Sequence, residues 1–224
     1  IAQTCCAEFG GQLMLVGTGQ SGLNDTPELG RLTGRFRVQV QLSDADVQAV
    51  TRKTVLKKKP SKRPDVKEVL KRHSGEISRH LSGTEFEPKP EDKKHLVDDY
   101  PLLPTRRRFW ERVLRAVDQA GTHSQVRTQL EIVDEAVKRT AGEPLGNVVA
   151  GDFIYDGLRP KLRQSGVLPQ DIDTRIEEVR ADEEDEVGAR LCALSFLIGK
   201  LPREEGADTG LRATPETFAD LLVK

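Results

Sequence analysis

Apolar residues follow two different periods along this chain. Near its start, the apolar run Gln12–Val16 and the alternating segment Arg37–Leu42 are typical of strands, in which neighbouring side chains point to opposite faces. From about Asp44 onward, apolar residues recur three and four positions apart, which predicts helices. We therefore expect a mostly α chain with a short two-stranded head.

Capping residues, Pro and Gly divide the helical part. One helix is predicted from a cap at Ser43–Asp46 to Lys59, and a second over about Asp65–Leu81. Residues 82–91, with Pro88 and Pro90 among charges, are predicted to be a linker. Beyond it the spacing predicts helices around 109–117, 126–137, 153–162, 172–179, 187–201 and 215–223, the last with Thr214 as N-cap and Pro215 in its first turn.

The 224 residues are 32% charged with a net charge of only −1, but the charges are unevenly distributed. Residues 51–74 hold ten Lys/Arg and two acids, whereas residues 171–186 hold nine acids and two Arg. Lys57, Lys58 and Lys59 are therefore candidates for binding a nucleic-acid backbone, although no aromatic side chains are interleaved for base stacking. The alternative, which the composition favours, is a solvated helix and loop.

Cysteine usage and hydropathy exclude several classes of protein. Three cysteines without C-x-x-C spacing indicate neither a disulfide framework nor a zinc site. No apolar run approaches the roughly 20 residues of a membrane span, and there is no signal peptide or initiator Met. We expect a cytoplasmic chain that begins within a fold and has no membrane partner.

In the head, a polar residue follows the first predicted strand and an arginine precedes the second. The C-terminal half of the core of ring-forming P-loop ATPases has the same order of residues. Thr18, with Gln20 as the alternative, follows the first strand where a sensor would contact the γ-phosphate of ATP. Arg35, at the foot of the next strand, is the candidate arginine finger, with Arg31 and Arg37 as alternatives. The two strands should then lie parallel.

Other motifs are weaker. No G-x-x-x-x-G-K-[ST] loop and no acidic pair after an apolar strand occurs, so ATP and Mg²⁺ would be held by a part of the enzyme outside this sequence. Gly17–Gly22 matches the G-x-G-x-x-G motif of dinucleotide-binding sites, but the residues after it are a poor helix start, so no such site is predicted.

His73 and His80 have no third ligand, so no metal site is predicted. The cluster Arg106–Arg108 is expected to cover the aromatic pair beside it or to bind an acidic partner.

Five strings resemble the large P-loop ATPases of BREX phage-exclusion systems, BrxC, and their phage-growth-limitation relatives, PglY. They are Asp99–Arg112, Gly75–Leu81, Pro144–Val149, Asp152–Asp156 and Arg212–Leu222. The resemblance covers nearly the whole chain. It implies an internal fragment of a much longer AAA+-like enzyme that acts in antiviral defence, together with other subunits and other BREX proteins.

The resemblance also implies an order of domains. Residues 1–42 would end the ATPase core, 43–82 would form a helical lid, 83–98 a linker and 99–224 a helical domain. Such a fragment alone should not hydrolyse ATP. The alternatives are a non-enzymatic helical protein-interaction module and a DNA-binding module that uses residues 52–72.

Overall fold

The computed structural model describes Gln12, Val16, Val38 and residues 44–117, 125–182, 185 and 187–223. The chain divides into two compact units, Ile1–Val47 and Gln48–Lys224, and most described residues belong to the second. These residues contain no strand, only an isolated bridge between Leu145 and Asn147. The prediction of a mostly helical chain is confirmed for this part.

The two predicted strands of the head lie almost wholly outside the described residues. Of their members, Gln12, Val16 and Val38 are described, and none of the three is in a strand. Val16 is 70% exposed and Val38 is 78% exposed, so the buried face that the alternation predicted is not found at these positions. The parallel pairing stays a prediction.

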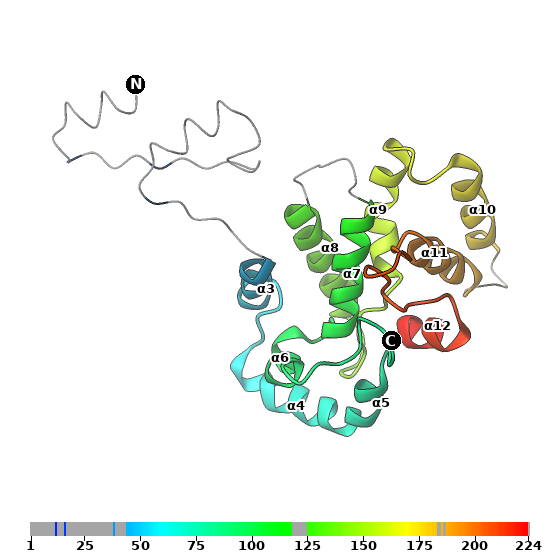
Figure 1. Cartoon of the computed structure of the whole chain (residues 1–224). Coiled ribbons are helices and arrows are strands. Elements are labelled where there is room, and N and C mark those ends of the chain that lie inside the picture. The colour runs from blue at the N-terminus through cyan, green and yellow to red at the C-terminus, as the bar shows by residue number, and fades with distance from the viewer. Residues whose placement is uncertain are drawn as a thin grey trace. The chain divides into compact units, whose positions relative to one another are not determined.

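One short 3₁₀ helix of three residues and α-helices of six to sixteen residues make up the second unit, and Figure 1 shows their arrangement. They are α3 (Asp44–Lys53, which belongs to this unit from Gln48), the 3₁₀ helix η1 (Pro60–Lys62), α4 (Arg63–Arg72), α5 (Ser74–Arg79), α6 (Asp92–Asp99), α7 (Pro104–Val117), α8 (Gln125–Thr140), α9 (Phe153–Gln164), α10 (Gln170–Arg180), α11 (Gly188–Gly199) and α12 (Pro215–Leu222).

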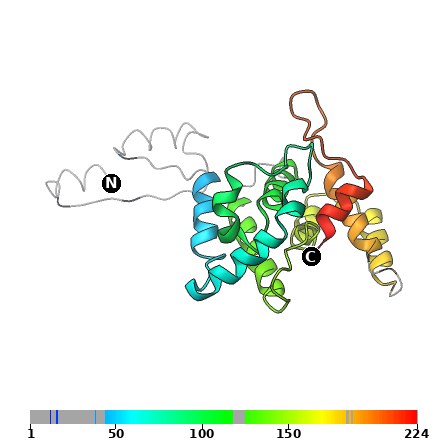
Figure 2. The same cartoon turned by 90° about the horizontal axis from the view of Figure 1, so that it is seen from below.

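Helix α7 lies in the middle of this unit, with α6 and α8 packed against it (Figure 1). Its residues Phe109, Trp110 and Val113 recur at helical spacing and are at most 1% exposed. Helix α8 packs on α9, and α11 contacts α9, α10 and α12, an arrangement that Figure 2 shows from below. One cluster of buried apolar side chains extends from Leu56 to Leu221. The unit therefore has a single core.

The predicted helices of the second half are confirmed within one to three residues at most ends. The clearest case is α12, where the Thr214 hydroxyl accepts a hydrogen bond from the backbone N–H of Thr217 at 3.3 Å and Pro215 occupies the first turn. A side-chain oxygen there satisfies an N–H that has no partner within the helix.

Two helices of the first half are shorter than predicted. The first ends at Lys53 rather than Lys59, because the chain turns to bury Leu56, which is 3% exposed, in the core. The second is divided into α4 and α5 at His73. Ser74 and Gly75, which follow directly, are poor helix formers, so the backbone can break there at little cost.

The predicted linker 83–98 is corrected by the structure. Its residue Phe86 is 1% exposed and meets Phe109 edge-on at 5.9 Å, and α6 occupies its second half. The prolines do limit helix formation, but one buried aromatic ring is enough to fix the segment to the core. Consequently the predicted lid, from Gln48 on, and the predicted helical domain form one unit rather than two. No helix among the described residues has both the length and the apolar character that crossing a bilayer requires.

Gly157 allows α9 to approach α8 closely. A Cβ at this position would lie 2.7 Å from Cγ1 of Ile132, whereas a Cβ at Gly75 in α5 would meet no atom within 4 Å. We expect Gly157→Leu to lower the free energy of unfolding by about 1–3 kcal/mol through overpacking. Gly75→Ala should leave it unchanged or raise it by up to about 1 kcal/mol. Urea unfolding followed by circular dichroism measures both, and equal midpoints for the two variants would contradict the close packing.

Candidate functional site

The nucleotide-site residues predicted from the sequence, Thr18, Gln20 and Arg35, lie outside the described residues. The alternatives Arg31 and Arg37 lie outside them too. Their assignment as sensor and arginine finger stays a prediction. The described part of the chain has polar clusters of its own, which centre on α7 and α6.

Arg106 of α7 is fully buried and joins three distant parts of the chain. Its guanidinium donates to the carbonyl oxygen of Val149 at 2.5 Å and to that of Asp220 in α12 at 2.7 Å, and its Nε donates to Nε2 of His80 at 3.3 Å. Burial lowers the pKa of Arg106 to about 10, so the group remains charged at neutral pH. A buried cation without hydrogen-bond acceptors would be very costly, and these acceptors offset that cost.

His80 is held neutral by this arrangement. Burial, with the Arg106 charge as a second cause, lowers the pKa of His80 to about 3. Since Nε2 accepts the hydrogen bond from Arg106, the proton of the neutral ring lies on Nδ1, which is 3.8 Å from Oδ1 of Asp220. The other carboxylate oxygen of Asp220 accepts from the backbone N–H of Leu81 at 2.7 Å. Asp220 therefore fixes the chain after α5 against α12.

Further hydrogen bonds attach α12 to α7 and α11. The indole N–H of Trp110 donates to the carbonyl oxygen of Gly151 at 2.8 Å, and the N–H of Gly151 donates to the carbonyl oxygen of Leu221 at 2.6 Å. Arg190 of α11 binds Asp152 through two bonds of 2.7 and 2.9 Å and also donates to the carbonyl oxygen of Leu222. Bidentate pairs of this kind fix orientation as well as position.

A second cluster surrounds Asp99 at the end of α6. This carboxylate is 1% exposed and accepts two hydrogen bonds from Arg52 of α3, at 2.6 and 2.9 Å. Arg107 of α7 lies 3.9 Å from it and also approaches Glu111 at 3.4 Å. The hydrogen bond to Asp99 raises the pKa of Arg52, while burial lowers the pKa of Arg107. Arg52 thereby links α3 to α6 and, through Asp99, to α7.

The three candidate nucleic-acid lysines do not behave alike. Lys58 is half-buried, and its ammonium group donates to the carbonyl oxygens of Leu56 at 2.8 Å and Asp98 at 2.5 Å. Burial lowers the pKa of Lys58 to about 8. Lys57 and Lys59 are exposed and have no partner among the described residues. Lys58 therefore has a structural role in this unit, and the assignment of these lysines to a nucleic-acid surface stays a prediction.

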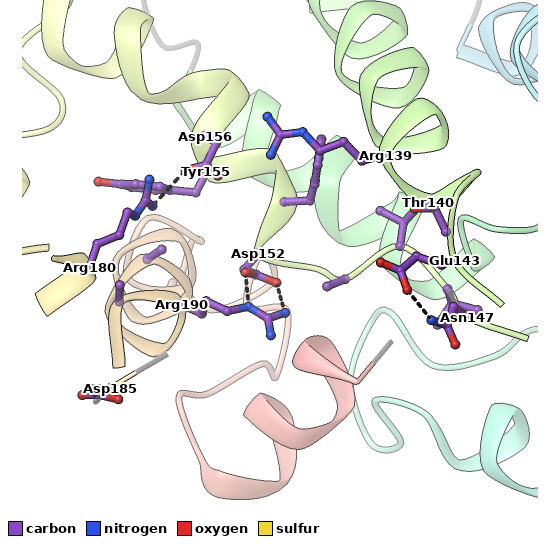
Figure 3. A pocket seen from close by; sticks show the side chains of 16 residues that line it. Arg139, Thr140, Glu143, Asn147, Asp152, Tyr155, Asp156, Arg180, Asp185 and Arg190 are labelled. Atoms are coloured by element: carbon purple, nitrogen blue, oxygen red, sulfur yellow. Dashed lines mark hydrogen bonds and ion pairs between the residues drawn. The ribbon is translucent and has the colours of Figure 1, made fainter. Parts of the chain in front are cut away.

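A cavity of about 440 Å³ lies between the end of α8 and the first turns of α9 and α11. Figure 3 shows three pairs of polar groups in its wall, whereas Arg139 and Asp185, which also line it, form no hydrogen bond or ion pair with the residues drawn. Asp152 is bound by Arg190, Arg180 donates to Asp156 at 2.9 Å, and Asn147 donates to Glu143 at 3.2 Å.

No catalytic or metal-binding arrangement is found in the described part of the chain. No group of three or more His, Cys, Asp or Glu residues there could hold a metal ion. His73 is exposed and pairs with Glu76 at 3.1 Å, whereas His80 is buried beside Arg106, so the two histidines are not brought together. The shifted pKa values of Arg52, Arg106 and Arg107 belong to groups that connect helices.

The sequence offered a signal for Arg106 that the prediction did not use. Arg106 precedes Phe109 by three residues and Trp110 by four, which places it on the same face of α7 as these two core residues. An arginine on a buried face needs internal acceptors. The prediction treated Arg106–Arg108 as one cluster that covers the aromatic pair or binds an acidic partner, and did not single out Arg106, which is 0% exposed.

Comparisons of the chain with protein-family models, with curated proteins and with solved structures find no match.

The depressed pKa of His80 makes stability depend on pH. In the unfolded chain His80 has its ordinary pKa of 6.5, so between pH 6.5 and about 3 the unfolded state binds the proton and the folded state does not. The contribution of neutral His80 is complete above pH 6.5 and is lost as the pH falls toward 3. His80→Gln keeps an acceptor for Arg106 but cannot titrate, so its urea midpoint should fall less over this range. Identical pH profiles for the native protein and His80→Gln would contradict the burial of His80.

The position of Lys58 predicts different effects for neighbouring lysines. Lys58→Met leaves two carbonyl oxygens without their donor and should lower the free energy of unfolding by about 1–3 kcal/mol. Lys57→Met, at an exposed position, should change it by no more than about 0.5 kcal/mol. Urea unfolding of both variants at neutral pH measures the difference. Equal stabilities would mean that Lys58 is as free as Lys57.

Proposed function

We propose that this chain is part of an AAA+-like P-loop ATPase of a BREX-type phage-resistance system. In this proposal, residues 1–42 belong to the end of the ATPase core, with Thr18 or Gln20 as sensor and Arg35 as arginine finger. ATP and Mg²⁺ bind at a phosphate loop in another part of the enzyme. The unit Gln48–Lys224 is a rigid helical extension that takes no direct part in the chemistry.

One observation carries this proposal. Each of the five strings that resemble the BREX ATPases supplies a residue to the connected polar groups around Arg106. These residues are His80, Arg106, Val149, Asp152 and Asp220, and all but Asp152 hydrogen-bond or approach one another directly. Asp152 joins them through Arg190, which also binds α12.

The residues of such a buried polar cluster are difficult to substitute. A buried guanidinium requires acceptors at defined distances, and removing any of them leaves a charge or a carbonyl group unpaired at a cost of about 1–3 kcal/mol or more. A resemblance in these residues therefore concerns the groups that determine how helices α5, α7, α9 and α12 assemble. Surface residues, which tolerate substitution, would carry much less weight.

The burial of the polar clusters also bears on the role that we propose for the helical unit. The polar clusters around Arg106 and Asp99 hold helices together, and neither is open to a substrate. We assign the chemistry to residues 1–42 and to the rest of the enzyme, and to the helical unit a contact with neighbouring subunits, other BREX proteins or DNA. The second candidate is a helical interaction module without enzymatic activity, which is favoured by the structural use of the perturbed groups in the described part of the chain.

The ATPase assignment is tested in the protein encoded by the complete coding region. Arg35→Ala should lower the rate of ATP hydrolysis by about a thousandfold or more, because the guanidinium would stabilise charge that develops in the transition state. Arg31→Ala and Arg37→Ala are matched controls that should retain most of the activity. The rate of phosphate release measures all three variants.

Two results would contradict the assignment. If Arg35→Ala hydrolyses ATP as fast as the native enzyme, Arg35 is not the finger. If the complete coding region contains no phosphate loop and its product does not bind ATP, the interaction module is the better proposal.

A further inference from the structure

The structure sorts the basic segment into cations that bind within the unit and cations that do not. Arg52 binds Asp99, Arg63 binds Asp98 at 2.6 Å, and Lys58 donates to the Asp98 carbonyl oxygen. These three cations attach α3, the loop 54–59 and α4 to the C-terminal end of α6. They are not available to a partner.

Six other lysines on the adjoining elements have exposed side chains and no hydrogen bond or ion pair among the described residues. They come from the loop before η1, from α4 and from α6, and we call them the lysine surface: Lys57, Lys59, Lys67, Lys71, Lys93 and Lys94. Helix α4 packs on both η1 and α6, so these elements adjoin in space (Figure 1). Lys67 and Lys71 are four residues apart and so lie on one face of α4.

No carboxylate on the same elements is left to neutralise these lysines. Each of the five acids between Lys57 and Arg72 and within α6 already pairs with a cation of the chain, and the shortest distances run from 2.6 to 3.4 Å. The pairs are Asp65 with Lys62, Glu68 with Arg72, Asp92 with Arg108, Asp98 with Arg63 and Asp99 with Arg52. Glu91, directly before α6, is an exposed acid whose carboxylate has no partner among the described residues, so the six lysines and this acid together carry a net charge of about +5.

The elements that carry these lysines are held firmly. Val66 and Leu70 of α4 are at most 5% exposed, and Asp92, in the first turn of α6, is bound by two hydrogen bonds from Arg108 of α7. Lysines on a fixed scaffold present their charges together. A polyanion with regularly spaced charges can then meet several of them at once and release its condensed counterions.

Two features of the chain indicate which polyanion fits. No Phe, Tyr or Trp occurs in 57–72 or in α6, and the exposed ring of His95 is the one stacking group there, so duplex phosphates are a better match than unstacked bases. In the acid-rich stretch 171–186, Asp173 is bound by Arg159 and Glu178 by Arg175, so these two acids of a second copy already have cations of their own. We propose that the lysine surface binds the phosphate backbone of double-stranded nucleic acid without sequence preference.

This inference does not depend on the ATPase assignment and is tested with the whole chain. Fluorescence anisotropy with a labelled duplex of about 30 base pairs and mixed sequence should detect binding at about 50 mM salt, with affinity falling steeply toward 200 mM. Four to six phosphate contacts correspond to a slope of roughly −4 to −5 in log affinity against log salt concentration. A duplex of a second, unrelated sequence should bind equally well.

Variants locate the contact. Lys67→Gln with Lys71→Gln should lower affinity by about tenfold or more and make the salt slope less steep by roughly 2, because two counterion-releasing contacts are lost. Lys57→Gln with Lys59→Gln should act similarly. The control with the same change in formal charge is Lys138→Gln with Arg203→Gln, and it should keep the native affinity and slope. Both cations are exposed and lie outside the lysine surface, although Lys138 pairs with Asp134 at 2.6 Å. Circular dichroism checks that each variant is folded.

Four outcomes would overturn the proposal. They are no duplex binding at about 50 mM salt, binding that is insensitive to salt, an equal loss in the control variant, and tighter binding to phosphatidylserine vesicles than to the duplex. The last outcome would assign the lysine surface to an anionic membrane instead.

Discussion

The buried charge of Arg106 is the constraint on which the arrangement of the helical unit depends. A guanidinium at 0% exposure is stable only where acceptors surround it, and here they come from the carbonyl oxygens of Val149 and Asp220 and from the ring of His80. Two of these acceptors are backbone atoms, so their positions are set by the paths of the chain rather than by a rotamer. Shifting α12 or the segment before α9 would leave the charge unpaired. Apolar packing alone would tolerate such a shift more readily.

Arginine and lysine have different roles in this unit. The arginines on α3, α7 and α11 bind carboxylates or carbonyl groups inside it, often through two hydrogen bonds. Most lysines between Lys57 and Lys94 project into solvent, and Lys58 is the exception because its stem turns inward beside Leu56. A planar guanidinium satisfies several acceptors in a fixed geometry, whereas an ammonium is strongly hydrated and favours the surface. The net charge of the chain is only −1, but its charges are not used evenly. Most acids of the helical unit have a hydrogen-bond or ion-pair partner, whereas the unpaired lysines are concentrated on α4, α6 and the adjoining loop.

The sequence predicted the helical part well wherever local signals decided the structure. The spacing of apolar residues located α7 to α12, and Thr214 with Pro215 marked the start of α12. The predictions failed where a distant contact decided instead. Phe86 fixes a proline-containing segment to Phe109, and the burial of Leu56 ends a helix early. The difference between Lys58 and its neighbours also depends on Asp98, forty residues away, so no local pattern could have shown it. The nucleotide-site residues Thr18 and Arg35 lie outside the described part, so they remain a sequence-based prediction.

The two polar clusters bear on how the helical unit would respond if residues 1–42 perform ATPase chemistry. The Asp99 cluster connects α3 with α6 and α7, and the Arg106 cluster connects α7 with α12. Both clusters include α7, whose apolar face is buried along most of its length. Two polar clusters that are joined by a well-packed helix do not deform gradually. A displacement of one cluster should therefore move the helical unit as a rigid body. Because Arg52 attaches α3 to this body, a change in the direction of α3 would displace the lysine surface together with α12.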